Sequence, residues 1–340
     1  MKKIVAIILI VAIVCINSAG LIGAVETGVC EQKKTRAQLL DDLIQTAMDD
    51  IDNIDEWTLK EDEGRKIDVS REVNAARDIG DVYTIKGTAP NYVETAAGAH
   101  YYAQTPHTNN YDYVAGFFEL PTDLRTEFDT ELNDKNRTAY ISVGFVGASH
   151  SVDVGIRNKE GNWHPYYYDG YPNLPDTPPS EWKGTYKAFD STVENGKYVA
   201  DSTAVCAAFF LKPYTKDTGE DVLICYITFY DSEDNVVANF NKALPIEEGN
   251  LLYVDDQLSG RFYRFVSLVQ PDGTIDNQQD GTYMLNAGFS DLRIDPYDDS
   301  VEEWGITTDT VENVWLVSPE RIQLEYGSNY ENSSIEHWAM

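Results

Sequence analysis

The heptapeptide EFDTELN, which begins at Glu127, places acidic side chains at alternate positions of the chain. Residues two apart on a β-strand point to the same side, so Glu127, Asp129 and Glu131 would lie close together on a strand. Neighbouring carboxylates can hold a divalent cation, or they can supply the acid and the base that cleave a glycosidic bond. The alternative is a solvated loop or helix, because the preceding LPTDLRT (120–126) is typical of the start of a short helix.

A second stretch, residues 162–186, combines aromatic side chains with prolines and carboxylates. Aromatic rings can stack on sugar rings, carboxylates accept hydrogen bonds from hydroxyls, and prolines limit the entropy lost on binding. The residues predicted to contact such a ligand are Trp163, Tyr166, Tyr168, Asp169, Tyr171 and Trp182. A further candidate is the stretch from His100 to Tyr113. The alternative for both stretches is that their aromatic residues alternate into a core and cover a sheet edge.

Other common chemistries leave no pattern in the sequence. It contains no nucleophile elbow, phosphate-binding loop or zinc-protease helix motif. The five histidines are scattered, and none has a second ligand type at a familiar metal-binding spacing. The sequence therefore nominates no catalytic residue outside the acidic heptapeptide.

The charge balance narrows the classes of partner. The chain has 57 acidic and 26 basic residues and a formal net charge of −31. A field of that sign repels phosphate backbones and anionic headgroups, so we expect neither nucleic acid nor a membrane surface as a partner. The acidity favours solubility outside the cell, and the alternative is that loop carboxylates capture calcium.

The first residues have the pattern of an export signal. Two lysines precede an unbroken apolar run from Ile4 to Ile16, and small or polar residues follow. We predict a signal peptide over residues 1–24, with cleavage after Gly20 as an alternative. An uncleaved anchor is possible, since continuing the run to Val25 gives about the 20 residues that a spanning helix needs. The expected location is secreted, periplasmic or at the cell surface.

The cysteines predict no disulfide framework. Beyond the signal peptide the chain has Cys30, Cys206 and Cys225, which is an odd number. A hairpin turning near residues 216–219 would place Cys206 opposite about residue 229, so the sulfurs of Cys206 and Cys225 would miss each other. We expect both to be buried and unpaired, and a bridge between them is the alternative.

The elements that must position these residues change character along the chain. Leucines and isoleucines at helical spacing predict a helix over about residues 35–57. From Val82 onward, short runs rich in Tyr, Val, Ile, Phe and Thr alternate with turn residues, which indicates about a dozen strands. The clearest are AYISVGFVG, SVDVGIRN, WHPYYYD, AVCAAFFLK, DVLICYITFYD and TYMLNAGFSDLRI.

This order of elements selects a fold class. No helices alternate with the strands and no repeat of 20 to 50 residues is visible, which disfavours a parallel α/β fold, a propeller and a solenoid. We predict an all-β fold, an antiparallel two-sheet jelly-roll-like sandwich with an N-terminal helix.

The domain boundaries follow from the same texture. Residues 25–80 form an N-terminal helical segment and linker, residues 81–296 the β-sandwich, and residues 297–340 C-terminal strands and a tail packed on it. The final residues, from Tyr330 on, are expected to be a loosely held tail.

The strand texture and the heptapeptide together resemble the concanavalin A-like jelly roll of lectins and laminarinase-type glucanases. EFDTELN resembles the metal strand of legume lectins, and by that resemblance Glu127, Asp129 and Asn133 would surround a metal ion, here calcium. The same letters also resemble the carboxylate strand of laminarinase-type glycosidases, which would make Glu127, Asp129 and Glu131 the candidate acids.

The predicted function is a secreted, lectin-like, non-catalytic carbohydrate-binding sandwich whose partner is an extracellular glycan. Two alternatives stay open. One is an extracellular glycoside hydrolase or polysaccharide lyase that uses the carboxylates of the heptapeptide. The other is a structural or adhesive surface protein that binds no small ligand.

Overall fold

The computed structural model of the 340-residue chain describes residues 33–54, 64–67, 82–87, 98–106, 110–127, 137–148, 151–159, 161–170, 184–188, 203–246, 248–269, 281–297 and 300–337. The predicted signal peptide lies outside these residues. Contacts divide the chain into Met1–Thr35 and a compact unit, Arg36–Met340. The fold described below is that of the second unit.

The N-terminal helix, α2 (Arg36–Asp49), is shorter than predicted. It buries Leu40, Leu43 and Ala47 on one side. Its last turn has no basic residue and is followed by Asp50, and carboxylates at this end interact unfavourably with the helix dipole. The helix therefore ends where the acidic residues accumulate. No helix among the described residues is long and apolar enough to cross a membrane.

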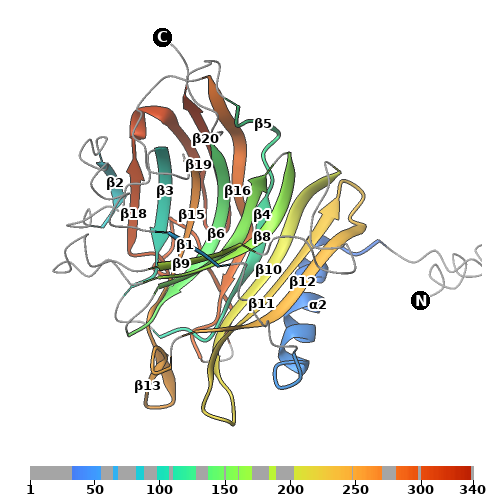
Figure 1. Ribbon diagram of the computed structural model, residues 1–340, viewed down its shortest axis with the longest axis vertical. Helices are drawn as coiled ribbons and strands as arrows, with labels where there is room; N and C mark the ends of the chain where they lie inside the picture. The colour runs from blue at the N-terminus through green and yellow to red at the C-terminus, as the bar shows by residue number, and fades with distance from the viewer. Residues whose placement is uncertain are drawn as a thin grey trace, which may run out of the picture. The chain divides into compact units, whose positions relative to one another are not determined.

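The first of two nine-stranded sheets, sheet A, is antiparallel throughout (Figure 1). Two short strands, β5 and β17, pair with β16 beside the main order. In spatial order the main strands are β12 (Val236–Pro245), β11 (Asp221–Asp231), β10 (Ala204–Thr215), β4 (Val114–Glu119), β16 (Thr282–Ile294), β20 (Glu331–His337) and β19 (Ile322–Tyr326), with β5 (Asp123–Arg125) and β17 (Glu302–Glu303) at the side.

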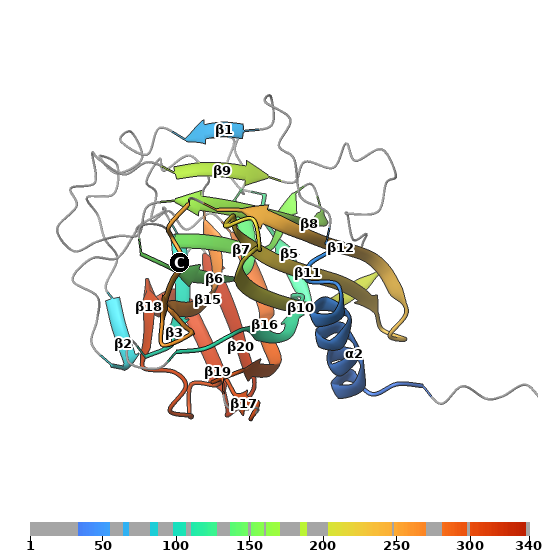
Figure 2. The same ribbon diagram turned by 90° about the horizontal axis from the view of Figure 1, so that it is seen from below.

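Sheet B is the second nine-stranded sheet, and its strands can be followed in order in Figure 2. They are β1 (Gly64–Ile67), β9 (Gly184–Ala188), β8 (Asn162–Gly170), β7 (Ser151–Lys159), β6 (Thr138–Val146), β15 (Arg261–Val269), β3 (Gly98–Gln104), β18 (Asn313–Val317) and β2 (Val82–Lys86). A separate hairpin joins β13 (Leu252–Val254) to β14 (Gln257–Ser259), and a 3-10 turn, η2 (Pro319–Arg321), precedes β19.

The predicted fold class is confirmed: the protein is an all-β, antiparallel, jelly-roll-like two-sheet sandwich with one helix before the strands. The predicted free cysteines are confirmed as well. Cys206 lies opposite Tyr230 and Cys225 opposite Leu211, so the two side chains point to opposite faces of sheet A and both are unpaired.

Two local predictions were wrong. The segment LPTDLRT does not start a helix, because β5 forms there and pairs with β16. The C-terminal residues are not a loose tail, because β20 lies inside sheet A between β16 and β19. Its buried positions, starting at Glu331 and ending at His337, are mostly polar, so the hydrophobic pattern that marks a buried strand is missing.

The core between the sheets is made by the inward positions of both. Phe118 and Phe209 of sheet A stack with ring centroids 4.5 Å apart, and Ile141 and Val266 of sheet B belong to the same buried cluster. Side-chain alternation along each strand means that the opposite positions form two outer faces. These outer faces are where the two sheets differ.

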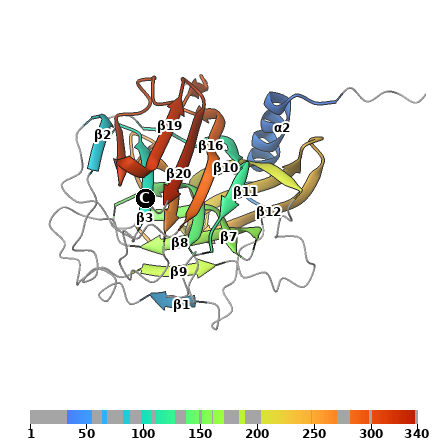
Figure 3. The same ribbon diagram turned by 90° about the horizontal axis from the view of Figure 1, so that it is seen from above.

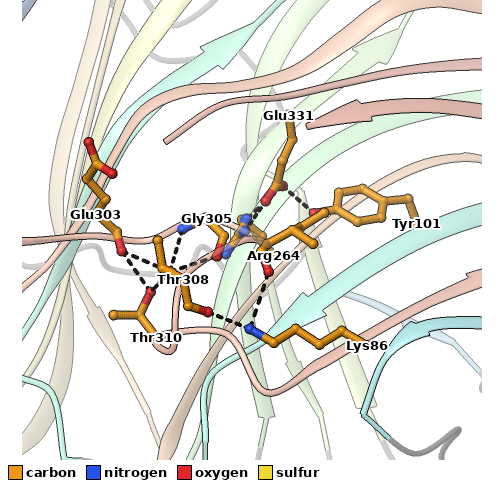
Figure 4. Close-up of polar contacts among 9 residues, drawn as sticks. Lys86, Tyr101, Arg264, Glu303, Gly305, Thr308, Thr310 and Glu331 are labelled. Atoms are coloured by element: carbon orange, nitrogen blue, oxygen red, sulfur yellow. Dashed lines mark hydrogen bonds and ion pairs between the residues drawn. The ribbon is translucent and has the colours of Figure 1, made fainter. Parts of the chain in front are cut away.

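A buried polar network ties the two sheets together (Figure 4). Arg264 of β15 donates to both carboxylate oxygens of Glu331 on β20, from Nε to Oε2 at 2.8 Å and from Nη2 to Oε1. The hydroxyl of Tyr101 on β3 donates to the same carboxylate, and the guanidinium lies 4.3 Å from the ring centroid of Trp304. All four side chains are buried. The network is inaccessible to a ligand, and its role is to fix one sheet on the other.

The chain passes from sheet A to sheet B in the segment between β17 and β18. A second set of hydrogen bonds, also drawn in Figure 4, fixes this segment. Lys86 of β2 donates to the carbonyl oxygens of Ile306, at 3.3 Å, and Thr308. Within the turn, the Thr310 hydroxyl donates to the carbonyl oxygen of Glu303 at 2.8 Å. This turn fixes where β18 begins.

Helix α2 covers the outer face of sheet A, which we call the sheet A face (Figure 3). Leu40 and Ala47 pack there against aromatic and aliphatic side chains of β4, β10 and β11 such as Phe117 and Phe210. Cys206 lies in this cluster, and burial raises its pKa to about 12. The sheet A face is therefore a second, smaller core.

Candidate functional site

The outer face of sheet B, which we call the sheet B face, is built from cross-strand rows. Because β18, β3, β15, β6, β7 and β8 pair in register, their outward residues line up across the sheet. The first row is Trp315, Tyr102, Phe265, Ser142, Gly155 and Tyr166. The second is Asn313, Gln104, Tyr263, Gly144 and Asp153, and the third is Val317, His100, Ser267, Tyr140, Arg157 and His164.

A group of stacked rings lies at the β18 end of the first row. The ring of Tyr102 stacks with Phe265 at a centroid distance of 5.1 Å and with Trp315 at 5.4 Å. The imidazole of His100 lies 5.8 Å from the same ring. Tyr102 on β3 and Trp315 on β18 are half-buried, so part of each ring is exposed.

At the other end of this row, Tyr166 crosses the strand beside it. Its hydroxyl and that of Ser142 on β6 form a hydrogen bond, although β7 lies between their strands. The residue crossed is Gly155, where a Cβ would lie 2.5 Å from the Ser142 hydroxyl oxygen. The sequence thus places a glycine where a tyrosine must lie flat on the sheet. The ring of Tyr140 meets Tyr166 edge to face at 5.1 Å.

The second row repeats this device. Tyr263 of β15 lies over Gly144 of β6, where a Cβ would be 2.3 Å from the ring, and donates its hydroxyl to Asp153 of β7. Burial raises the pKa of Tyr263 well above its ordinary value, and the negative charge of Asp153 raises it further. Tyr263 therefore keeps its proton and remains the donor that fixes the carboxylate.

The polar groups of the face come from the third row and from the start of β15. His100, Arg157 and His164 stand on the third row. Arg261 follows one step beyond the second row and donates from Nη1 to Oε1 of Gln104 at 3.0 Å. Burial lowers the pKa of Arg261 and the charge of Glu312 raises it. At neutral pH the guanidinium stays charged, because an arginine titrates far above it.

The sheet B face combines several kinds of group that can contact a ligand. It offers ring faces for stacking and fixed donors and acceptors within one surface, which is the composition of a small-molecule or sugar site. Among the described residues, no three His, Cys, Asp or Glu side chains gather in a way that could hold a metal ion. The groups that could move a proton here are the imidazoles of His100 and His164.

The predicted ligand residues of the aromatic stretch do not share one surface. Trp163 is buried in the core between the sheets, whereas Tyr166 lies on the sheet B face. Tyr168 and Asp169 lie on β8, and their side chains are outside the described set. Tyr171 and Trp182 lie outside the described residues altogether. The alternation of a strand separates neighbours that the sequence places together.

The predicted metal ligands fall mostly outside the described residues. Glu127 is exposed just after β5, and Asp129 and Asn133 are not described. A calcium site at these three residues therefore stays a prediction. The same holds for the catalytic alternative, which depends on Asp129 and Glu131.

Sequence reasoning missed most of the sheet B face. The stretch from His100 to Tyr113 was a candidate, and it does contribute His100 and Tyr102, but Tyr111 and Tyr113 are buried elsewhere. Phe265 and Trp315 were not predicted. The signal that could have found Phe265 is the alternation in RFYRFVS (261–267), in which residues two apart share a face.

Comparison with known proteins adds little to this geometry. No protein-family model matches the chain, and no curated protein matches its sequence. Among solved structures, the crystal structure of alginate lyase vAL-1 from Chlorella virus is similar at 10% identity and a TM-score of 0.29. The alignment covers 80% of this chain and 98% of that chain. At this level the likeness carries no argument about activity.

Proposed function

We propose that this protein binds an extracellular glycan through the sheet B face and does so without catalysis. The observation that carries the proposal is the stack of Tyr102 with Phe265 and Trp315 beside the polar third row. Tyr102 and Trp315 are half-buried, and the exposed parts of their rings can contact the C–H groups of a sugar.

The local construction of the face supports the same function. Tyr263 and Tyr166 are buried and are held by hydrogen bonds to Asp153 and Ser142, so the layer beneath the half-buried rings does not have to be ordered when a ligand binds. A preorganised site lowers the entropy cost of binding.

The test uses a glycan array followed by titration of the best glycan, with tryptophan fluorescence as the readout. We expect Tyr102→Ala to weaken binding about tenfold, which corresponds to about 1.4 kcal/mol. The matched control is Tyr330→Ala, since Tyr330 is 47% exposed in the turn between β19 and β20 of sheet A. Equal losses in both variants, or an array without any response, would exclude this function.

Two further assays on the wild-type protein distinguish glycan binding from the enzymatic and the adhesive alternatives. A glycoside hydrolase or polysaccharide lyase would release shorter products from the glycan that it binds, and Glu127→Gln would abolish that release. An adhesive protein would show no glycan response and would instead associate with itself as its concentration rises in light scattering.

A further inference from the structure

We propose that the glycan bound by the sheet B face is anionic, a sugar chain whose units carry carboxylate or sulfate groups. This inference rests on the proposed function and names the class of ligand for the same site. It follows from the charge of the face relative to the rest of the molecule.

The described outward positions of the sheet B face have the opposite charge balance to the chain. The chain as a whole has 57 acidic against 26 basic residues. On the strands β3, β6, β7, β8, β15 and β18, one described outward carboxylate, Asp153, stands among two guanidinium groups, those of Arg157 and Arg261. Two outward imidazoles, His100 and His164, are buried beside them.

The one carboxylate of these rows is already engaged. Tyr263 donates its hydroxyl to Asp153, which leaves that oxygen less available to a sugar hydroxyl. A second carboxylate, Glu312, lies just before β18 and interacts with Arg261. It stands at the margin of the face, outside the strand rows. The interior of the face is therefore the region where an anion meets the least repulsion among the described strands.

Sheet A differs from the sheet B face in its exposed charges. Its strands and their ends expose carboxylates at many described positions, including Asp123, Glu302, Glu303 and Glu325. Helix α2 adds Asp41, Asp42 and Asp49 on its exposed side. An acidic protein that keeps carboxylates off one aromatic face has a surface suited to a ligand of its own charge.

The positions of the two arginines set the geometry of the ligand. Along β15 the order of outward residues is Ser267 of the third row, Phe265 of the first, Tyr263 of the second, and then Arg261. Arg157 lies on the third row, so the two aromatic rows lie between the arginines. Along β15, Arg261 lies six residues from Ser267 of the third row, so the level of Arg261 and the level of Arg157 are about 20 Å apart. A chain of several sugar units lying along the strands could place an anionic group at each end and stack its rings between.

The experiment compares ligands that differ only in charge. Hexamers of galacturonate, glucuronate and mannuronate are titrated against the full chain, each beside the same hexamer with its carboxyl groups reduced to hydroxymethyl groups. We expect the acidic hexamer of at least one configuration to bind at least tenfold more tightly than its reduced form. A sulfated neutral hexamer forms a third arm and distinguishes sulfate from carboxylate as the anion.

Two variants locate the effect on the sheet B face. We expect Arg157→Gln and Arg261→Gln each to weaken binding of the acidic hexamer by about three- to tenfold and to weaken binding of the reduced hexamer by a smaller factor. The matched control is Arg125→Gln on β5 of sheet A, which should change neither. Each variant is checked by its circular dichroism and unfolding midpoint, so that a folding defect is recognised as such.

The outcomes separate this inference from the function on which it rests. Reduced hexamers that bind as tightly as the acidic ones would overturn the inference and leave glycan binding intact. Binding of acidic hexamers that is equally weakened by Arg125→Gln would also overturn it, since attraction would not come from the face. If neither acidic, sulfated nor reduced hexamers bind, and the glycan array is silent too, both the inference and the proposed function fall.

Discussion

The two outer faces of this sandwich are both aromatic, yet their rings have different neighbours. The sheet A face contains Phe117, Phe210 and Tyr226, and α2 covers it with Leu40 and Ala47. The sheet B face includes Tyr102, Tyr166 and Phe265, and polar groups stand between its rings. The same residue class thus packs with aliphatic side chains on one side and with polar groups on the other.

The two faces use their rings differently. On the sheet A face the rings pack against one another and against the aliphatic side chains of α2, which removes their apolar area from water. On the sheet B face, hydroxyls of two tyrosines are held by Asp153 and Ser142. Fixed polar groups next to ring faces give orientation as well as affinity. If the two faces are independent, a change on the sheet A face should leave glycan affinity at the sheet B face unchanged.

The largest expected effect lies in neither face but in the core that both share. Glu331→Ala leaves the guanidinium of Arg264 buried without its carboxylate and should lower the free energy of unfolding by about 3–5 kcal/mol. Urea unfolding measures this loss. The matched control is Glu336→Ala on the same strand, which is half-buried and should cost far less.

A double variant shows whether this loss arises from the unpaired charge. Arg264→Met combined with Glu331→Leu removes both charges and should recover much of the stability, because well-packed apolar residues can replace a buried ion pair. A double variant as unstable as Glu331→Ala would contradict that explanation. Folded Glu331→Ala protein should still bind glycan with unchanged affinity.

The next effect belongs to the sheet A face alone. Leu40→Ala removes a fully buried side chain under α2 and should destabilise the protein by about 3 kcal/mol. It should also loosen the cover over Cys206, whose pKa burial raises to about 12, so that a thiol reagent at pH 8 reacts faster than with the wild type. Met48→Ala, at a 38% exposed position of the same helix, is the control.

Measuring glycan affinity in the same variant tests whether the sheet A face and the sheet B face are independent. If the two faces are separate, Leu40→Ala should leave binding at the sheet B face unchanged in conditions where the variant is folded. A parallel loss of affinity would show that α2 supports both faces and that they are not independent.

The fold could be predicted from the sequence because its strongest strands are hydrophobic on the right period. TYMLNAGFSDLRI is a single strand, β16, and DVLICYITFYD is β11. What failed was β20, ENSSIEH, whose inward residues Glu331, Ser333 and His337 are polar. Its place in the sheet depends on Arg264, which lies 67 residues earlier in the chain. No local pattern contains that pairing.

The candidate site was less predictable for a related reason. Tyr166 was predicted because it lies in the aromatic-rich stretch 162–186, but Trp163 of the same stretch faces the core. Tyr102, Phe265 and Trp315 meet only because β3 lies between β15 and β18. The glycines at positions 144 and 155 make sense only once the register shows which tyrosine crosses each of them.

Acid should destabilise the protein through a buried histidine, His337. Burial, together with Arg137 and Arg321, lowers the pKa of His337 to about 2, whereas the unfolded residue titrates near 6.5. Below pH 6.5 the unfolded state therefore binds a proton that the folded state does not, and stability is lost as the pH falls. The loss should reach about 2–3 kcal/mol at pH 4.5.

The measurement is the free energy of unfolding from pH 7.5 to 4.5 in the wild type and in His337→Gln. The variant should lose this part of the pH dependence while the contribution of the other groups remains. Identical slopes in the two proteins would contradict the prediction, because the buried imidazole would then titrate no differently in the two states.

The smallest expected effect concerns calcium, and it tests the comparison from the side of sheet A. If Glu127, Asp129 and Asn133 hold the ion, calcium at ten times its dissociation constant should stabilise the protein by about 1.4 kcal/mol, and chelation should reverse this. Glu127 follows β5, which pairs in sheet A, so the shift in unfolding midpoint should come without a change in affinity at the sheet B face. Glu127→Gln should abolish the shift, whereas Glu325→Gln, an exposed change on β19, should preserve it. A shift that survives Glu127→Gln would place the ion elsewhere, and a calcium-dependent glycan affinity would mean that the ion serves the sheet B face.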